Sequence, residues 1–201
     1  MENKVKIVGL GGSLKADSTS LMALRFALDA AEESGAEVEM FDVRELNLPM
    51  YTPGMEAPAA ATRLARTACA AQGMIWSSPL YHGTVSGSFK NAIDWLDLLR
   101  GEDPPFLSDK IIGLVSTAGG TQGLQAINTM EYIVRALRAW AVPFVLPVGQ
   151  AWQAFDAHGH PSDPRTAEQL QTLGSEVVRA AQQMGATGSC DYSEPTMFKA
   201  R

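Results

Sequence analysis

The stretch VKIVGLGGSLKADSTSLMALRFALDAAEESG, residues 5–35, predicts a strand, a loop and a helix in that order. Its opening residues are β-prone and apolar, and they stop at Gly11-Gly12-Ser13, which is a loop signal. From Ser18, whose hydroxyl suits a helix N-cap, leucines and alanines recur at helical spacing until Gly35, which suits a C-terminal cap. A strand that leads through a glycine turn into a helix is the first unit of an α/β fold.

The same pattern recurs along the rest of the chain. Strand-like apolar runs are expected at residues 36–43, 73–78, 111–117 and 143–148. Helical patterns follow them over about residues 57–71, 89–96, 127–137 and 170–184. About five strand–helix repeats predict a doubly wound sheet of parallel strands with helices on both faces.

Length and charge narrow the function classes. The 201 residues suit one domain, which we expect to cover residues 1–186, with residues 187–201 as a loose C-terminal tail. The formal net charge of −6 lacks the positive field that holds a phosphate polymer, so nucleic acid is not an expected partner.

Location follows from the apolar runs and the cysteines. The N-terminus lacks a signal peptide, and the apolar runs are shorter than the roughly 18 residues of a membrane span. Cys69 and Cys190 lie far apart without a C-x-x-C pattern, so we expect neither a disulfide framework nor a thiolate zinc site. These features predict a cytoplasmic protein that is not bound to a membrane.

Three loops after predicted strands have an unusual composition: Gly11–Ser20, Ser77–Thr84 and Ser116–Gly123. Open parallel sheets bind ligands beyond the carboxyl ends of their strands, where the strand order reverses. We therefore expect these loops to meet around one ligand.

The first loop has the makings of an anion site. It combines a helix N-terminus with four hydroxyls and the mobile charge of Lys15, which suits a phosphate monoester. A capped helix after a tight turn is the alternative. Three other templates fail: a dinucleotide fingerprint would need glycine at Leu14, a serine-hydrolase elbow would need glycine at Lys15, and the Gly-Lys-Ser/Thr end of a P-loop is missing. Hydrolysis is therefore a minor alternative.

The second and third loops suit a flat ligand. Ser78-Pro79-Leu80-Tyr81-His82-Gly83 couples a rigid proline to two aromatic rings and a glycine. Gly119 and Gly120 leave backbone N–H groups uncovered, where a ring carbonyl can accept from them. Each loop alone is more often a plain turn, but their joint placement favours a slot for a planar heterocycle.

These loops, together with Phe89–Leu96, resemble the flavodoxin-like NAD(P)H-dependent FMN reductases, which include quinone, azo-dye and chromate reductases. The resemblance extends through about Gly185 and implies a flavodoxin-like fold with bound FMN. It places the phosphate in the first loop, the isoalloxazine along the second, and the pyrimidine end of the ring at the third. The implied cofactor-binding residues are Ser13, Lys15, Ser18, Thr19, Ser20, Pro79, Leu80, Tyr81, His82, Gly83, Ser116, Gly119 and Gly120.

The resemblance also implies a reaction. NADPH or NADH would reduce the flavin by hydride transfer, and quinones, azo compounds, metal ions or free flavin would then be reduced in a ping-pong sequence. No catalytic side chain is required; Tyr81 and His82 shape the slot. Family members often carry arginine where Lys15 stands, so the donor preference stays open. The alternative is a flavodoxin-like electron carrier or flavin-binding module that acts on a protein partner.

Two further expectations concern assembly and metals. Leu48-Pro49-Met50-Tyr51-Thr52 resembles the segment that reaches toward a neighbouring subunit's flavin, which implies a homodimer or homotetramer with the flavin near the subunit boundary. A surface loop is the alternative of equal weight. His158 and His160 lack a further ligand set, so we expect no metal.

Overall fold

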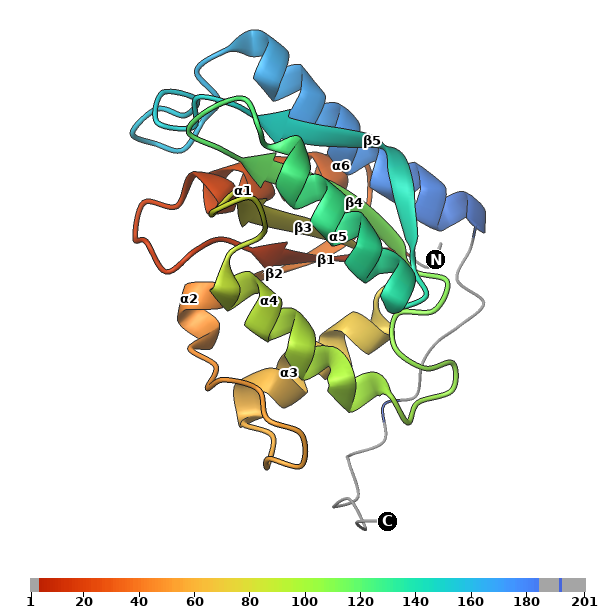
Figure 1. Ribbon diagram of the computed structural model, residues 1–201. Helices are drawn as coiled ribbons and strands as arrows, with labels where there is room; N and C mark the ends of the chain where they lie inside the picture. The colour runs from red at the N-terminus through yellow and green to blue at the C-terminus, as the bar shows by residue number, and fades with distance from the viewer. Residues whose placement is uncertain (1–3, 185–191, 193–201) are drawn as a thin grey trace.

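The computed structural model describes residues 4–184 and residue 192. Its centre is a parallel sheet with the strand order β2-β1-β3-β4-β5 (Figure 1). The strands are β1 (Lys6–Gly11), β2 (Glu37–Asp42), β3 (Gly73–Pro79), β4 (Ile111–Thr117) and β5 (Trp140–Val148). The predicted doubly wound sheet is confirmed, and its order is the flavodoxin-like one.

Burial explains the composition of the strands. Every residue of β3 and β4 is buried, because helices cover both faces of the sheet. The edge strand β2 carries Glu39, which accepts hydrogen bonds from Lys6 Nζ and Arg63, each at 2.9 Å. The other edge strand, β5, contains Pro143 and Pro147. Charges and prolines of this kind protect an exposed edge from pairing with another chain.

One face of the sheet is covered by α1 (Thr19–Glu33) and α6 (Pro164–Met184), which pack against each other. Gly174 makes their close approach possible. A Cβ at that position would lie 2.2 Å from the carbonyl oxygen of Ala27 on α1, so no other residue fits there without a backbone shift. Figure 1 shows the two helices on the same side of the sheet.

The opposite face is covered by α3 (Ala59–Ala70), α4 (Gly87–Asp94) and α5 (Leu124–Ala136). A 3-10 turn, η1 (Trp95–Leu99), continues α4. The core beneath them is built around large apolar side chains, with Trp76 of β3 edge-on to Phe89 of α4 at a centroid separation of 6.0 Å. One core on each face holds the sheet between two layers of helices. The loops at the strand ends therefore start from fixed positions.

Several elements differ from the predicted ones, and α5 and α6 begin earlier than expected, at Leu124 and Pro164. β5 begins at Trp140, earlier than the expected residue 143, because Trp140 and Ala141 already pair with Ile111 and Ile112 of β4. The expected helix over residues 89–96 ends as an α-helix at Asp94. A short helix, α2 (Val43–Leu46), was not predicted, since four residues carry no helical periodicity; the Asp42 carboxylate caps it by accepting from the Arg44 amide at 2.9 Å.

Lys110 lies just before β4, at the amino edge of the sheet, and is only 5% exposed. Its ammonium donates to the carbonyl oxygens of Cys69 and Ala71 at the end of α3, both at 2.6 Å. Burial lowers the pKa of Lys110 to about 8. A charged side chain is therefore kept inside the protein in order to satisfy the end of a helix.

Cys69 corrects one expectation. It lies buried on α3 and is disulfide-bonded, whereas the sequence suggested unpaired cysteines. The argument from the cysteines for a reducing compartment therefore does not hold. The other cysteine of the chain, Cys190, lies outside the described residues, as does most of the predicted tail over residues 187–201.

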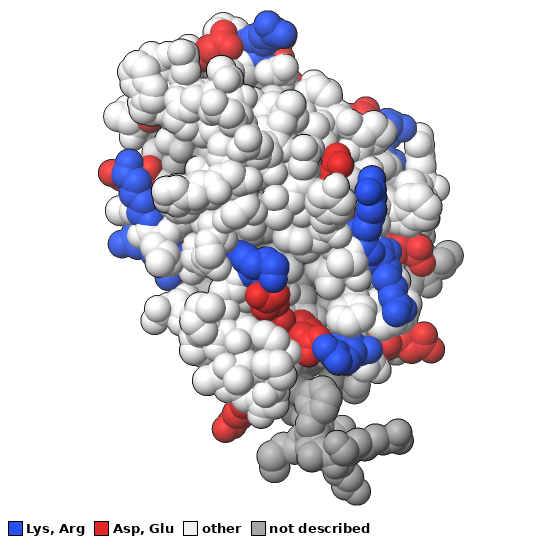
Figure 2. Space-filling view, in the orientation of Figure 1, with Lys and Arg blue, Asp and Glu red and all other residues white. Residues whose placement is uncertain are grey.

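The surface carries charges of both signs. Figure 2 shows acidic and basic side chains interspersed over the face drawn. Lys90 pairs with Asp94 on α4, and Arg100 pairs with Asp97 of η1. No helix within residues 4–184 combines the length and apolar character that crossing a bilayer requires.

Candidate functional site

A cleft of about 140 Å³ opens at the carboxyl edge of the sheet, where the loops after β1, β3 and β4 meet. The strand order reverses at this point, because β2 pairs with one side of β1 and β3 pairs with the other. Such a reversal leaves a crevice between neighbouring loops. The cleft is lined by Ser13, Lys15, Asp17, Ser18, Thr19, Ser20, Pro79, Leu80, Tyr81, Thr117, Ala118, Gly119 and Ala151.

The loop after β1 presents a chain of hydroxyl groups. Ser13 Oγ donates to Ser18 Oγ at 3.2 Å, and Ser18 Oγ lies 2.9 Å from Ser20 Oγ. All three serines are buried among the neighbouring loops. Ser18 is also the N-cap of α1, where its hydroxyl accepts from the amide of Leu21 at 3.4 Å. The hydroxyls therefore lie at the positive end of the helix, as an anion site requires.

The backbone of this loop is held in place from β3. Gly12 has φ +96°, and its amide donates to the carbonyl oxygen of Ser77 at 3.1 Å. The amide of Lys15 donates to Ser13 Oγ at 3.3 Å, while the side chain of Lys15 stays exposed. The amides of Thr19 and Ser20, the first two residues of α1, have no acceptor among the described residues, whereas those of Leu21 and Met22 donate to Ser18. Lys15 adds the mobile positive charge.

The loop after β3 forms a tight two-residue turn. Tyr81 and Thr84 exchange backbone hydrogen bonds of 2.9 and 3.1 Å, and His82 and Gly83 between them have φ +49° and +88°. Positive φ at both central residues is typical of a type I′ turn, in which glycine is favoured at the second position. The turn holds Tyr81 at the rim of the cleft, where its side chain is 48% exposed.

The loop after β4 is fastened at both ends. Ala118 donates to the carbonyl of Val148, and its own carbonyl accepts from the amide of Ala151, both at 2.9 Å. Thr117 Oγ1 accepts from Thr19 Oγ1 at 3.4 Å, which links this loop to α1. No acceptor within residues 4–184 and 192 takes the amide N–H of Gly119 or Gly120. Two exposed donors are therefore available at this end of the cleft.

Most of the predicted binding residues come together here, and four do not line the cleft. His82 and Gly83 directly follow Tyr81 but face outward from the turn as exposed residues. Gly120 is exposed beside Gly119. Ser116 is fully buried, and its hydroxyl donates to the carbonyl of Gly123 at 2.8 Å. Ser116 thus holds the loop in place instead of offering its hydroxyl to a ligand.

The cleft also contains residues that sequence reasoning did not select. Asp17, Thr117 and Ala118 lie within the loops already singled out, so closer attention to those loops would have found them. Ala151 follows β5, whose carboxyl end meets the same edge of the sheet. Only the strand order brings that loop to the cleft, and the order cannot be read from periodicity.

The arrangement suits a ligand with a charged end and a flat end. Hydroxyls, helix amides and Lys15 gather at one side of the cleft, while Pro79, Leu80, Tyr81 and the exposed glycine amides lie at the other. A phosphate monoester fits the first side, and a planar ring with carbonyl groups fits the second. FMN has both parts. Within residues 4–184 and 192, no cluster of three His, Cys, Asp or Glu side chains gathers to hold a metal ion.

Comparisons with known proteins agree with this geometry. A family model described as NADPH-dependent FMN reductase matches residues 5–153. A relative from Rhizobium meliloti, NADPH-dependent FMN reductase ArsH, is 30% identical over 177 residues, covering 88% of this chain and 72% of the relative. The NADPH:quinone oxidoreductase of Arabidopsis thaliana is 29% identical over 178 residues, covering 84% and 88%. The FerB flavoenzyme of Paracoccus denitrificans has the same fold, with a TM-score of 0.73 at 20% identity over 90% of this chain and 98% of FerB.

Proposed function

The chain belongs to the NADPH-dependent FMN reductase family, enzymes that use FMN with NADPH or NADH, and from this premise we propose its site and its reaction. It binds FMN in the cleft at the carboxyl edge and transfers electrons from NAD(P)H to quinones, azo compounds, metal ions or free flavin. The observation that carries this proposal is the convergence of three loops that place hydroxyls and a lysine opposite a hydrophobic rim.

The phosphate group is bound by the loop after β1. The donors to the phosphate would be the hydroxyls of Ser13, Ser18, Thr19 and Ser20, the amides of Thr19 and Ser20 and the Lys15 ammonium. The mutual hydrogen bonds of the serines hold their oxygens together in advance, so little side-chain entropy is lost on binding. Lys15 contributes charge without a fixed orientation.

The ring system is bound by the loops after β3 and β4. Main chain from Pro79 to Gly83 lines one side of the ring, and the type I′ turn keeps that main chain in a single conformation. The amide of Gly119, with that of Gly120 exposed beside it, would donate to the pyrimidine end and stabilise negative charge there, as preorganised donors do at other anionic centres. Ser116 supports them by holding the loop through Gly123.

When bound, FMN supplies the redox chemistry by taking a hydride from the reduced nicotinamide and passing the electrons to the acceptor. Tyr81 shapes the slot at its rim and would restrict it to flat molecules, while His82, exposed on the adjoining turn, would border its entrance. Donor and acceptor occupy the same rim of one small cleft, so they bind in turn, and the kinetics follow a ping-pong pattern.

The loop of residues 48–52 completes the site in an oligomer. It is anchored within its own chain, because the Asn91 side chain accepts from the Tyr51 amide at 2.8 Å and donates to the Pro49 carbonyl at 2.9 Å. Met50, between these anchors, is 76% exposed. We propose that this loop contacts the flavin site of a second copy in a homodimer or homotetramer and excludes water from it. Sedimentation that shows only monomers would refute this assembly.

The visible spectrum of the purified protein, with a melting scan in added FMN, tests the cofactor. Saturation at about 100 times the dissociation constant stabilises the fold by about 2.7 kcal/mol. Stopped-flow mixing with NADH or NADPH then tests the reaction through bleaching of the flavin absorbance. A colourless protein whose melting temperature ignores FMN contradicts the proposal. Bleaching without turnover of a small quinone favours the electron-carrier alternative.

A further inference from the structure

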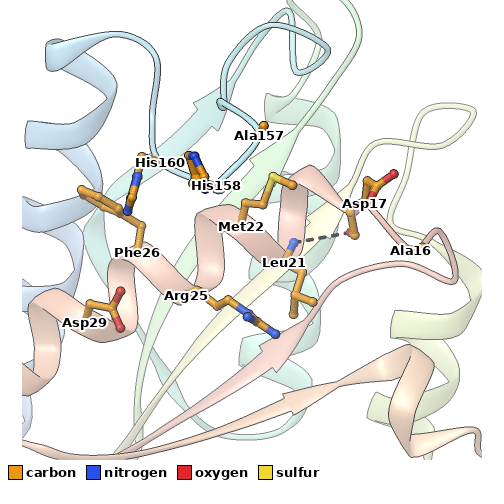
Figure 3. Close-up of a pocket in the computed structure, with 12 residues that line it drawn as sticks. Ala16, Asp17, Leu21, Met22, Arg25, Phe26, Asp29, Ala157, His158 and His160 are labelled. Atoms are coloured by element: carbon orange, nitrogen blue, oxygen red, sulfur yellow. Dashed lines mark hydrogen bonds between the residues drawn. The ribbon is translucent and has the colours of Figure 1, made fainter.

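A second pocket, of about 280 Å³, lies next to the proposed flavin cleft (Figure 3). It lies between the outer side of α1 and the loop that follows β5. Asp17 and Ser18 line both cavities, so the two adjoin at the start of α1. The second pocket is the larger of the two and has no role in the FMN site described above.

Its walls can hold an aromatic ring. Leu21, Met22 and Phe26 of α1 form an apolar floor, and the loop of residues 157–160 brings two imidazoles over it. Gly159, at φ +86°, brings this loop close, since a Cβ there would lie 3.4 Å from Met22 Cγ. In Figure 3, His160 and Phe26 lie at one end of the pocket and Asp17 lies at the other.

Hydrogen bonds within the loop of residues 156–160 fix its backbone before any ligand binds. Asp156 Oδ1 accepts from the amides of His158 and His160 at 2.8 and 2.9 Å. These backbone hydrogen bonds lower the pKa of Asp156, which therefore stays ionised and keeps the turn closed around it. Both imidazoles are consequently presented from a fixed backbone.

Within the protein, the charged side chains of this pocket interact at longer range, since Arg25 and His160 attract the Asp29 carboxylate. Within the described part of the chain, Asp17, Arg25 and Asp29 take part in no hydrogen bond or ion pair. Partial burial raises the pKa of Asp29, which lies at the end of the pocket far from the cleft. A carboxylate in this setting accepts hydrogen bonds from sugar hydroxyls, and Arg25 provides positive charge for a phosphate nearby.

We propose that this pocket binds the adenosine half of the reduced nicotinamide dinucleotide. The adenine ring lies on Phe26 and Met22 beneath His160, the ribose hydroxyls donate to Asp29, and the phosphates face Arg25. The cavity is close to the lower limit of about 300 Å³ for ligand pockets, which suits one nucleoside. This inference rests on the proposed function, because the nicotinamide must reach the flavin in the adjoining cleft.

Two variants test the pocket in the FMN-loaded protein. Met22→Trp fills the pocket, and Asp29→Asn removes the charge of an exposed carboxylate without disturbing the core. Calorimetric titration with 5′-AMP should show binding to the wild type and a dissociation constant roughly tenfold higher in each variant, as expected on loss of a charged hydrogen bond or of its space. The KM for NADH should rise by a similar factor. The KM for reduced nicotinamide mononucleotide, which lacks the adenosine half, should stay unchanged.

Glu168→Gln is the matched control, since Glu168 is an exposed carboxylate on α6 outside the pocket. Absence of AMP binding to the wild type overturns the inference, as does an equal rise in KM for both donors. If Met22→Trp fails to fold, Asp29→Asn alone decides. Failure of the proposed function is distinguishable, because AMP would then still bind in the pocket while neither donor bleaches the flavin.

Discussion

The two edges of the sheet treat their polar groups in opposite ways. At the amino edge, the chain satisfies itself: Lys110 is buried and donates to two carbonyls at the end of α3. At the carboxyl edge, the amides of Gly119 and Gly120 find no acceptor within the described residues, and three serine hydroxyls are grouped around an open cleft. Both edges are formed by the same strands. The lysine at the amino edge has its acceptors within the protein, whereas the glycine amides at the carboxyl edge have none among the described residues.

This difference between the edges predicts that the amino edge contributes to stability and the carboxyl edge to ligand binding. A buried donor or acceptor that loses its partner costs about 1–3 kcal/mol, so the amino edge should be sensitive to substitution. Exposed donors at the carboxyl edge are hydrated in the absence of a ligand and contribute little to folding. These donors contribute favourable binding free energy when an anion replaces the water. Substitutions at one edge should therefore change the unfolding free energy, and those at the other should change the affinity for FMN.

The largest expected effect is at Lys110. Lys110→Met leaves the buried carbonyls of Cys69 and Ala71 without a donor, and we expect the unfolding free energy to fall by about 3 kcal/mol. Urea titration measures this loss, and FMN affinity should not change. Lys90→Met is the control, because the exposed pair of Lys90 with Asp94 is worth about 0.5 kcal/mol. Equal stability of the two variants would break the comparison.

The second prediction concerns pH. The pKa of Lys110 is about 8 in the folded protein and 10.5 in an unperturbed lysine, so the unfolded state binds more protons between these values. Stability should therefore rise as the pH increases from about 8 to 10.5, by about 3 kcal/mol. Urea titrations at several pH values measure the slope. A Lys110→Met protein that keeps the same rise would show that another group causes it.

The third prediction moves to the carboxyl edge. The side chain of Lys15 is exposed, so Lys15→Met should change the unfolding free energy by less than about 0.5 kcal/mol. It removes a charge from the phosphate site, and we expect the FMN dissociation constant to rise roughly tenfold. Fluorescence titration of FMN gives the constant, with Lys90→Met again as the control. A loss of stability without a loss of affinity would reverse the assignment of this loop.

The sequence predicted the positions of the strands and helices better than it predicted which loops meet at the cleft. Periodicity located all five strands, since β3 and β4 are buried throughout and apolar except at their carboxyl ends, and glycine-containing exits marked the loops after β1, β3 and β4. Nothing local revealed that the loop after β5 reaches the cleft through Ala151. The inward turn of Ser116 was also hidden, since its partner Gly123 is set by the course of the loop.

Pairings between distant segments were the other omission. The lysine before β4 reads as an ordinary surface cation until α3 is placed beside it, because the acceptors of Lys110 are backbone carbonyls 39 and 41 residues away. Likewise, His158 and His160 are exposed loop residues without a metal-ligand set, and only the tertiary structure sets them beside α1 at a pocket. Residue types predict a site where neighbours in sequence form it, and they miss it where separate elements do.

The smallest expected effect concerns a loop that departs from the carboxyl edge but is satisfied within its own chain. Tyr51 Oη donates to Asp97 Oδ2 at 2.6 Å, and its ring packs edge-on against Trp95. Burial, together with the hydrogen bond to Asp97, raises the pKa of Tyr51 to about 12. Tyr51→Phe should lower the unfolding free energy by about 1 kcal/mol, because the Asp97 carboxylate loses a donor. The affinity of the monomeric unit for FMN should be unchanged.

The pH dependence identifies the origin of that loss. Because the folded pKa of Tyr51 lies above its unfolded value of 10.0, the folded state binds more protons between pH 10 and about 12. The stabilisation is complete below pH 10 and disappears as the pH rises through 12. The difference in stability between wild type and Tyr51→Phe should therefore shrink in alkaline urea titrations. A constant difference would mean that the hydroxyl stabilises the fold through packing and not through its proton. The contribution of a loop to the unfolding free energy would then depend on its position along the sheet edge and not on its internal hydrogen bonds.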